Sequence, residues 1–234
     1  WSIQAKYDAW LKVEKAAVKA WNKLGFISDS DCEKICKNAK FEVARIDEIE
    51  KTTKHDVIAF LTSVSESLGE ESRFVHYGMT SSDCIDTAVA LQMKESLELI
   101  ISDVEEFMQA VKNRANEHKH TLMVGRSHGI HGEPITFGLV LAIWYDEIAR
   151  ALKLIKDAKD TISYGKLSGA MGNLAHAPME FEELTCEELG LKAAPASNQV
   201  IQRDRYAHVV SAIAILASTC EKIAVAIRHY QRTE

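Results

Sequence analysis

The densest group of chemically active side chains lies in residues 125–134, which read GRSHGIHGEP. Two imidazoles, a carboxylate, a guanidinium and a hydroxyl fall within eight residues of this segment. They belong to Arg126, Ser127, His128, His131 and Glu133. Three glycines in the same segment let the backbone approach a ligand closely. A polar connection between two helices is the alternative, but this density of functional groups favours a site for proton transfer.

The spacing of His128 and His131, three residues apart, raises a metal site as a second alternative. No helix is predicted to hold the pair, and no further cysteine or aspartate stands at a usual ligand spacing. A metal site is therefore disfavoured. Pro134 is predicted to be the first residue of the next helix. A backbone N–H at that position would have no partner within the helix, so proline, which lacks an N–H, is favoured there.

Two earlier segments place polar side chains at predicted helix starts. His55 and Asp56 stand within a capping-box pattern that begins at Thr53, and a simple cap is the interpretation these residues favour by themselves. His76 precedes the hydroxyl cluster 80–82, TSS. Hydroxyls and free backbone N–H groups at a helix N-terminus form a ready site for a carboxylate or phosphate. A cap without a ligand is the alternative there.

Two later segments are also polar. Residues 166–173, KLSGAMGN, lack the GK[ST] sequence of a phosphate-binding loop, so nucleotide binding by that route is not supported. Residues 197–205, SNQVIQRDR, gather amides and arginines at a predicted helix start, where a solvated face is an equally good interpretation. These segments at helix ends suit a site between the helices of a bundle, built from several subunits, that acts on an anionic substrate by proton transfer.

The elements that must position these segments are long helices. The 234 residues include 11 Gly and 3 Pro, and the windows 79–124, 139–164 and 196–234 contain neither. An antiparallel sheet protein needs turn residues every 8–12 positions, so an all-β fold is excluded. Apolar periodicity predicts long helices at 82–119, 135–163 and 199–233, and shorter ones at 1–24, 41–51, from 53 to near Gly69, and 179–189. The helix at 82–119 would be ~57 Å long, which indicates an elongated bundle.

The predicted fold class is therefore all-α. A small N-terminal helical domain is expected over 1–80, followed by a long-helix bundle over 81–234. Residues 205–227 are apolar on more than one face, which favours burial of this helix by oligomerisation.

The charge and the cysteine content limit the kinds of partner and the cellular compartment that are expected. The formal net charge of −6 argues against a nucleic-acid surface. No run approaches 18 apolar residues and no signal peptide is visible, so neither a membrane nor secretion is expected. The five cysteines are scattered and odd in number, which predicts buried or partly buried thiols in a reducing, cytoplasmic compartment. The sequence starts at Trp1 and stops at Glu234 inside helical patterns, so we expect it to be the N-terminal part of a longer chain.

Five segments carry a family resemblance that extends over essentially the whole sequence. They are TKHDVIAF (53–60), HYGMTSSD (76–83), GRSHGIHGEPITFG (125–138), KLSGAMGN (166–173) and SNQVIQRDR (197–205). Together they resemble the adenylosuccinate lyases of the fumarase/aspartase superfamily. The resemblance implies β-elimination of fumarate from N6-succinyl-AMP to give AMP, and from the succinylated carboxamide ribotide of purine synthesis. It also implies a homotetramer with shared active sites and no metal or organic cofactor.

The resemblance further assigns roles to residues. His128 matches the general acid that protonates the leaving nitrogen, and His55 matches a second histidine that supports the acid and contacts the substrate. The matching substrate-binding residues are Lys54, Asp56, His76, Thr80, Ser81, Ser127 and Gln199. Among these, His76 corresponds to the phosphate side, and the hydroxyls and the amide correspond to the succinyl group. Lys54 stands where many members have Arg, and Ser127 where many have Thr.

One departure from the family pattern is an absence. The family's base is a serine on a mobile loop, SSxMPxKxNP, which does not occur in this sequence. That loop and a third domain are expected to follow Glu234, so residues 1–234 alone are expected to be inactive. A sibling such as argininosuccinate lyase and a non-catalytic helical oligomerisation module are the alternatives. The intact GRSHG and TSSD clusters argue against the second, because a pure scaffold has no use for them.

Overall fold

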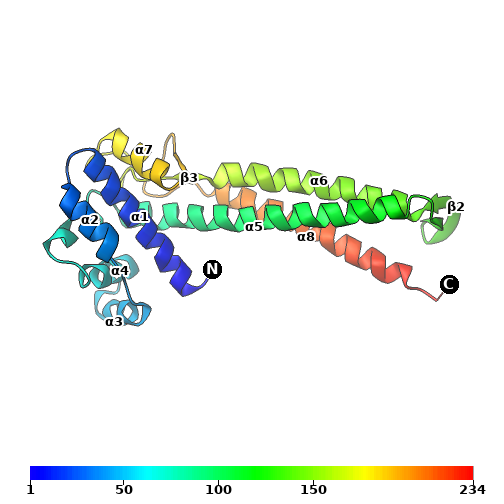
Figure 1. Cartoon of the computed structure of the whole chain (residues 1–234), viewed down its shortest axis with the longest axis horizontal. Helices are drawn as coiled ribbons and strands as arrows, with labels where there is room; N and C mark the ends of the chain where they lie inside the picture. Colours follow the sequence, from blue (N-terminus) through cyan, green and yellow to red (C-terminus); the bar gives the residue numbers. More distant parts are fainter. Residues whose placement is uncertain (234) are drawn as a thin grey trace. The chain divides into compact units, whose positions relative to one another are not determined.

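The computed structural model describes residues 1–233 of the chain and is predominantly helical (Figure 1). Its helices are α1 (Ile3–Lys23), α2 (Asp29–Asn38), α3 (Val43–Thr53), α4 (Asp56–Ser65), the 3₁₀ helix η1 (Glu70–Phe74), α5 (Ser81–Glu117), α6 (Phe137–Ile162), α7 (Met179–Glu188) and α8 (Asp204–Tyr230). Two small sheets pair β1 (Leu122–Ser127) with β2 (Ile130–Thr136), and β3 (Tyr164–Gly165) with β4 (Lys192–Ala193). The all-α prediction is confirmed, and the three long predicted helices correspond to α5, α6 and α8.

The chain divides into two compact units. The first contains residues 1–94 and 163–203, and the second contains 95–162 and the described residues from 204 onward. This division differs from the predicted boundary after residue 80, because the start of α5 and the segment 163–203 pack with the N-terminal helices. The first unit is thus made of two stretches of sequence, and α5 begins in one unit and ends in the other.

Aromatic packing fills the core of the first unit. The rings of Tyr7 and Trp10 on α1 meet Phe60 on α4 at centroid distances of 5.7 and 5.4 Å, and Phe41 lies 5.7 Å from Phe60. Edge-to-face and stacked pairs at such distances contribute stability beyond the area they bury. A second cluster stacks Trp21 of α1 on Phe181 of α7, with centroids 4.4 Å apart. These contacts fix α1 against both α4 and α7.

The start of α4 differs from the prediction. Thr53 is the last residue of α3, and the capping residue of α4 is His55, whose Nδ1 accepts a hydrogen bond from the Ile58 backbone N–H at 3.4 Å. An imidazole nitrogen here takes the part that a hydroxyl or carboxylate oxygen usually plays at an N-cap. The helix ends at Ser65, before the predicted Gly69, and the chain continues as η1.

The second unit is built from the later part of α5, together with α6 and α8. Buried residues of α6 such as Trp144, Ile148 and Ile155 face a core to which α8 contributes Val209 and Ile223. Ion pairs join α5 to α6, with Lys156 2.6 Å from Glu105. The large apolar residues of α8 that stay exposed are Val210, Ile213, Ile215, Val225, Ile227 and Tyr230.

The helix α8 is long and apolar enough to cross a membrane, judged by length and composition alone. Only 17% of its most apolar window is buried in this chain. A helix with apolar residues on several faces needs cover from protein or lipid. The sequence predicted no membrane-spanning run, whereas one helix in the described residues, α8, has the length and composition of such a span.

The cysteines are all free, as predicted. Cys32, Cys84 and Cys186 are buried and Cys36 is half-buried. Cys220 lies exposed on α8, contrary to the prediction that all five would be at least partly buried. Burial raises the pKa of the Cys186 thiol to about 12, so this cysteine is an inert apolar group in the core.

We expect Phe60→Ala to lower the free energy of unfolding by about 3–5 kcal/mol, because it leaves a cavity between the rings of Tyr7, Trp10 and Phe41. The matched control is Ile58→Ala on the same helix, whose side chain is 49% exposed and whose loss should change stability by less than about 0.5 kcal/mol. Urea denaturation followed by circular dichroism measures both. Equal losses for the two variants would contradict the aromatic core.

Candidate functional site

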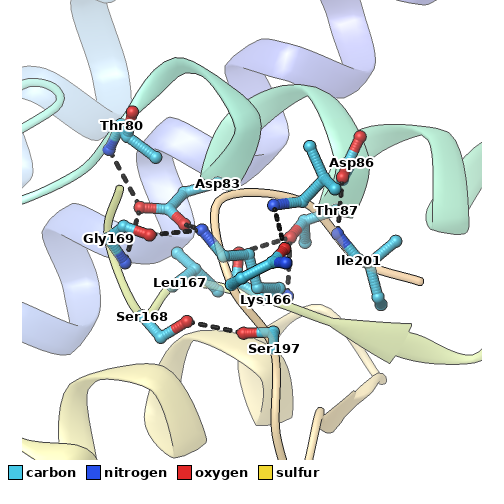
Figure 2. A network of polar contacts seen from close by, with 12 residues as sticks. Thr80, Asp83, Asp86, Thr87, Lys166, Leu167, Ser168, Gly169, Ser197 and Ile201 are labelled. Atoms are coloured by element: carbon cyan, nitrogen blue, oxygen red, sulfur yellow. Dashed lines mark hydrogen bonds and ion pairs between the residues drawn. The ribbon is translucent and has the colours of Figure 1, made fainter. Parts of the chain in front are cut away.

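Three segments that are distant in the sequence meet at the first two turns of α5 (Figure 2). At the centre is an ion pair whose side chains are both 0% exposed, with Lys166 Nζ 2.5 Å from Asp83 Oδ1. The same ammonium donates to the Gly169 carbonyl at 2.6 Å. A buried charge is stable only when it is paired and hydrogen-bonded, and here each partner satisfies the other.

The Asp83 carboxylate also binds backbone. Its Oδ2 accepts from the Thr80 N–H at 2.9 Å and from the Gly169 N–H at 3.2 Å. The first bond is one half of a capping box, in which a side chain in the first turn reaches back to the residue before the helix. Burial raises the pKa of this carboxyl above its ordinary value, although the hydrogen bonds from Lys166, Thr80 and Gly169 act in the opposite direction. One side chain thereby fixes the backbone on either side of the cluster.

The next turn of α5 holds two loop segments, one at Lys166 and one at residues 201–203. Thr87 Oγ1 accepts from the Lys166 N–H at 3.0 Å and donates to the Lys166 carbonyl at 3.1 Å. Asp86 accepts from the Ile201 N–H at 2.8 Å and from the Arg203 guanidinium at 3.0 Å. Residues three and four apart share one helix face, so the spacing of Asp83, Asp86 and Thr87 presents all three to the loops.

The loops also bond to each other. Ser168 and Ser197 share a hydrogen bond of 2.8 Å between their hydroxyls (Figure 2). Gly172 has a φ of +73°, and a Cβ on it would lie 2.2 Å from the Ser197 carbonyl oxygen. Only glycine allows both this left-handed backbone and so close an approach. The segments 166–173 and 197–203 therefore form one structure with the start of α5.

The predicted hydroxyl site lies beside this cluster. Thr80 and Ser81 are half-buried, at the residue before α5 and at its first residue. Gln199 is exposed in the loop that leads to α8. The prediction that a helix starts at 199 is wrong, because α8 begins at Asp204 and residues 197–203 form an anchored loop.

His76 is bound by a residue that the sequence did not single out. Its Nδ1 lies 2.7 Å from Glu14 Oε1, and its backbone N–H donates to Glu14 Oε2 at 2.9 Å. Glu14 is 1% exposed on α1. Burial acts to lower the pKa of His76, but the hydrogen bond and charge of Glu14, with a contribution from Asp83, raise it, and the net shift is upward.

Two further predicted site residues, Lys54 and Asp56, stand on either side of His55. Lys54 ends α3 in the left-handed conformation with φ +54°, and its side chain is exposed. Asp56 begins α4, and its Oδ1 accepts from the Val57 N–H at 2.8 Å and lies 3.6 Å from His55 Nδ1. His55 is thus an N-cap with a neighbouring carboxylate, and the ring is half-exposed.

In the second unit, the segment GRSHGIHGEP forms a β-hairpin, which was not predicted from the sequence. Ser127 pairs with Ile130, which leaves His128 and Gly129 as the two-residue turn. Their φ values of +54° and +74° are those of a type I′ turn, whose twist matches antiparallel strands. The hairpin exposes Ser127 and His128 to solvent at its tip.

Pro134 lies within this hairpin and not at a helix start. Pro134 is a residue of β2 and pairs with Val124 of β1, and α6 begins only at Phe137. A two-stranded sheet has two edges, so a proline without an N–H is accommodated there. The register shifts between Val124 and Arg126, which gives Gly125 the place of a bulge.

Backbone strain is concentrated at predicted site residues. Four described residues other than glycine have a positive φ, namely Lys54, His76, His128 and Leu174. Three of these four were selected from the sequence as site residues. A side chain in the left-handed region is energetically unfavourable and persists where the surrounding structure imposes it, which is frequent at functional sites.

Sequence reasoning missed Glu14, Asp86 and the partnership of Asp83 with Lys166. Glu14 did give a signal, because it falls on the apolar face of its helix between Trp10 and Val18. The ion pair gave none, since its partners are 83 residues apart. Within residues 1–233, no group of three His, Cys, Asp or Glu side chains is placed to hold a metal ion.

The comparison with protein families decides what kind of chain this is. A family model described as lyase matches residues 1–234. The chain belongs to this lyase family. The chain is 66% identical over all 234 residues to adenylosuccinate lyase of Helicobacter pylori (strain ATCC 700392 / 26695), and 49% identical over the same length to that of Staphylococcus saprophyticus. It covers 53% and 54% of these two proteins, so the chain spans about half the length of the curated relatives it matches.

The fold of the chain also matches a solved structure. A fumarate lyase from Mesorhizobium sp. BNC1 superposes on it with a TM-score of 0.92 at 25% sequence identity. The match covers 99% of this chain and 56% of the other. The fold of the chain is therefore shared with this solved structure.

We expect Lys166→Met to lower the free energy of unfolding by about 3–5 kcal/mol, because it leaves the Asp83 carboxylate buried without its counter-charge. Adding Asp83→Asn should cost less than the sum of the two single changes, since the pair is already broken. Lys156→Met, which removes an exposed pair with Glu105, is the matched control and should leave the urea midpoint nearly unchanged. Strict additivity of the two buried variants would contradict the pairing.

We also expect Gly172→Ala to destabilise the protein more than Gly169→Ala does. Both glycines have a positive φ, so either alanine incurs about 1–2 kcal/mol of backbone strain. Only at Gly172 does the new Cβ also meet the Ser197 carbonyl, whereas at Gly169 no atom lies within 4 Å. Thermal unfolding of the two variants measures the difference. If both variants lose the same stability, the close approach of the two loops is not a constraint.

Proposed function

We propose that the protein is an adenylosuccinate lyase that releases fumarate from N6-succinyl-AMP and from the succinylated carboxamide ribotide of purine synthesis. One observation carries the proposal: three of the five segments in the resemblance meet as one hydrogen-bonded cluster at the start of α5. The identity to adenylosuccinate lyases along the whole chain supports it. The proposed protein is cytoplasmic, acts on a small molecule, and binds neither nucleic acid nor a membrane.

The cluster suits the electronic demand of a β-elimination. Removing a proton beside a carboxylate generates a dianionic aci-carboxylate, which fixed donors stabilise more than they stabilise the ground state. Thr80 and Ser81 offer hydroxyls at the N-terminus of a 37-residue helix, where backbone N–H groups and the helix dipole add to the positive potential. Because Asp83 and Lys166 fix the backbone around them, these donors do not need to reorganise as charge develops. Gln199 is proposed to add an amide to the same succinyl group.

The histidines supply the proton and further binding. His128 is proposed to protonate the departing nitrogen, since histidine is the side-chain type that most often serves as a general acid near neutral pH. Its exposed place at a hairpin tip leaves the ring accessible to a substrate. His55 is proposed to support the acid and to contact the substrate with Lys54 and Asp56, and Ser127 is proposed to lie beside the succinyl carboxylates.

The complete site is proposed to form between copies of the chain in a homotetramer. The hydroxyl cluster belongs to the first compact unit and the His128 hairpin belongs to the second. The resemblance to lyases with shared active sites is what assigns both groups to one site of the assembly. The exposed apolar side chains along α8 support the same proposal, because another copy would cover them. The catalytic base is proposed to come from sequence that the 234 residues do not contain.

We expect His128→Ala in the full-length protein to reduce turnover of N6-succinyl-AMP by roughly 10²–10⁴, the usual contribution of a positioned acid. The Michaelis constant should change much less, because the proton is transferred only in the transition state. The matched control is His120→Ala, an exposed histidine eight residues earlier, which should retain the native turnover. Absorbance at the wavelength of substrate loss follows each reaction.

The same assay tests the proposed function itself. Native protein should release fumarate from N6-succinyl-AMP and release none from argininosuccinate, the substrate of the sibling lyase. Turnover of argininosuccinate alone would replace the proposed substrate, and no turnover of either would leave the chain a helical oligomerisation module. Near-native turnover by His128→Ala would overturn the acid assignment and make His55 the next candidate.

A further inference from the structure

Glu14 is a carboxylate in an apolar environment. It lies on the face of α1 that also carries Trp10, Val13 and Val18, and it is 1% exposed. Removing an ionised carboxylate from water is costly unless its oxygens are hydrogen-bonded. Such a residue in a core is retained for a specific partner, and here both oxygens bind the same residue, His76.

The two bonds determine the conformation of His76. Oε2 accepts the backbone N–H at 2.9 Å and Oε1 contacts the ring Nδ1 at 2.7 Å, while the backbone holds φ at +65°. A carboxylate is only an acceptor, so Nδ1 must carry a proton. Nε2 is then the ring atom left to bind another group, and in the described part of the chain it has no hydrogen-bond partner. The side chain keeps 17% of its surface exposed, so the ring is not sealed in the core.

We propose that Glu14 is a positioning residue, which fixes the orientation and proton of His76 so that the ring binds an anionic group of the substrate as an imidazolium. This inference rests on the proposed function. It goes beyond it by assigning the charge state of His76 and the residue that maintains that state. A second-shell carboxylate on a histidine is a common means of fixing a tautomer and increasing the basicity of the other nitrogen.

The charges around the ring favour its protonated form. Two carboxylates act on the ring, Glu14 from α1 and Asp83 from α5, and the Cys84 thiol of α5 interacts with Glu14. Lys166 already neutralises Asp83, and burial raises the pKa of the Cys84 thiol so that it stays uncharged. Glu14 is thus the one unneutralised charge of these three. Its hydrogen bond and charge outweigh the burial that acts to lower the pKa of His76.

A pH dependence follows from this arrangement. The imidazolium exists below the raised pKa of His76 and loses its proton as the pH rises through it. Affinity for an anionic group should therefore fall with increasing pH across that range. A histidine without the carboxylate would lose its charge at a lower pH.

The test is Glu14→Gln in the full-length protein, with binding of AMP measured by calorimetry from pH 5.5 to 8.5. The amide preserves the size of the side chain and its acceptor for the His76 N–H, but removes the charge. For each unit by which the pKa of His76 falls, the AMP affinity above both pKa values should drop about tenfold relative to native protein. The AMP affinities of the two proteins should converge as the pH falls below the pKa of His76 in both, because the ring is then protonated in each. Comparison at equal pH cancels the titration of the ligand phosphate.

Controls separate the sources of the effect. Glu188→Gln, which removes an exposed ion pair to Lys19 of α1, should leave the pH profile of binding unchanged. Adenosine and fumarate are parallel probes: a loss for AMP but for neither of these places His76 at the phosphate, and a loss for fumarate places it at a succinyl carboxylate. Unchanged affinity for AMP and fumarate at every pH would overturn the inference. An equal loss at all pH values would overturn it too, since that is the signature of a purely structural role.

Native protein provides a second measurement if Glu14→Gln does not fold. Calorimetry of AMP or fumarate binding in buffers of different ionisation enthalpy measures proton uptake, which on the alkaline side of the His76 pKa should be larger in native protein than in His76→Asn. Equal uptake by the two would contradict the inference. Native fumarate release from N6-succinyl-AMP is measured first, so a failure of the proposed function is recognised separately.

Discussion

The buried ion pair between Asp83 and Lys166 is the interaction on which the rest of the candidate site depends. It joins the first turn of α5 to the loop 166–173, and through the same carboxylate it holds the backbone of Thr80. Desolvating two charges is expensive, and a pair of apolar side chains could have filled this volume with no loss of stability. What an apolar pair could not do is orient three backbone groups at once. The arrangement is therefore better explained by precision at the start of α5 than by stability alone.

Much of the fold could be predicted from the sequence because it depends on local periodicity. The helices α5, α6 and α8 lie close to their predicted ranges, since each has a long apolar pattern without Gly or Pro. The hairpin was missed because His128 and Gly129 form a turn usually signalled by Asn-Gly, and because Pro134 suggested a helix start. The cap of α4 was misplaced for a similar reason, as an imidazole took the role expected of the Thr53 hydroxyl.

The residue types of the candidate site could be predicted from the sequence, but the tertiary contacts that hold those residues could not. The hydroxyls at Thr80 and Ser81 and the histidines were visible as residue types at helix ends. Their supports were not, because Asp83 and Lys166, or Glu14 and His76, are brought together by tertiary folding alone. A buried carboxylate on an apolar helix face, such as Glu14, is the one signal in the sequence that announced a missing partner. The left-handed backbone at Lys54, His76 and His128 is likewise a product of the assembled structure.

Because the first unit consists of two stretches of sequence, it cannot complete its folding until the second stretch has been synthesised. Residues 1–94 leave the ribosome well before residues 163–203, which complete their core and neutralise Asp83. At a translation rate of about 5–20 residues per second, the carboxylate waits for several seconds until its lysine has been made. During that interval Phe181 is also absent from its place on Trp21. The N-terminal helices must therefore remain incompletely packed, and exposed to chaperones and proteases, until most of the second unit has been translated.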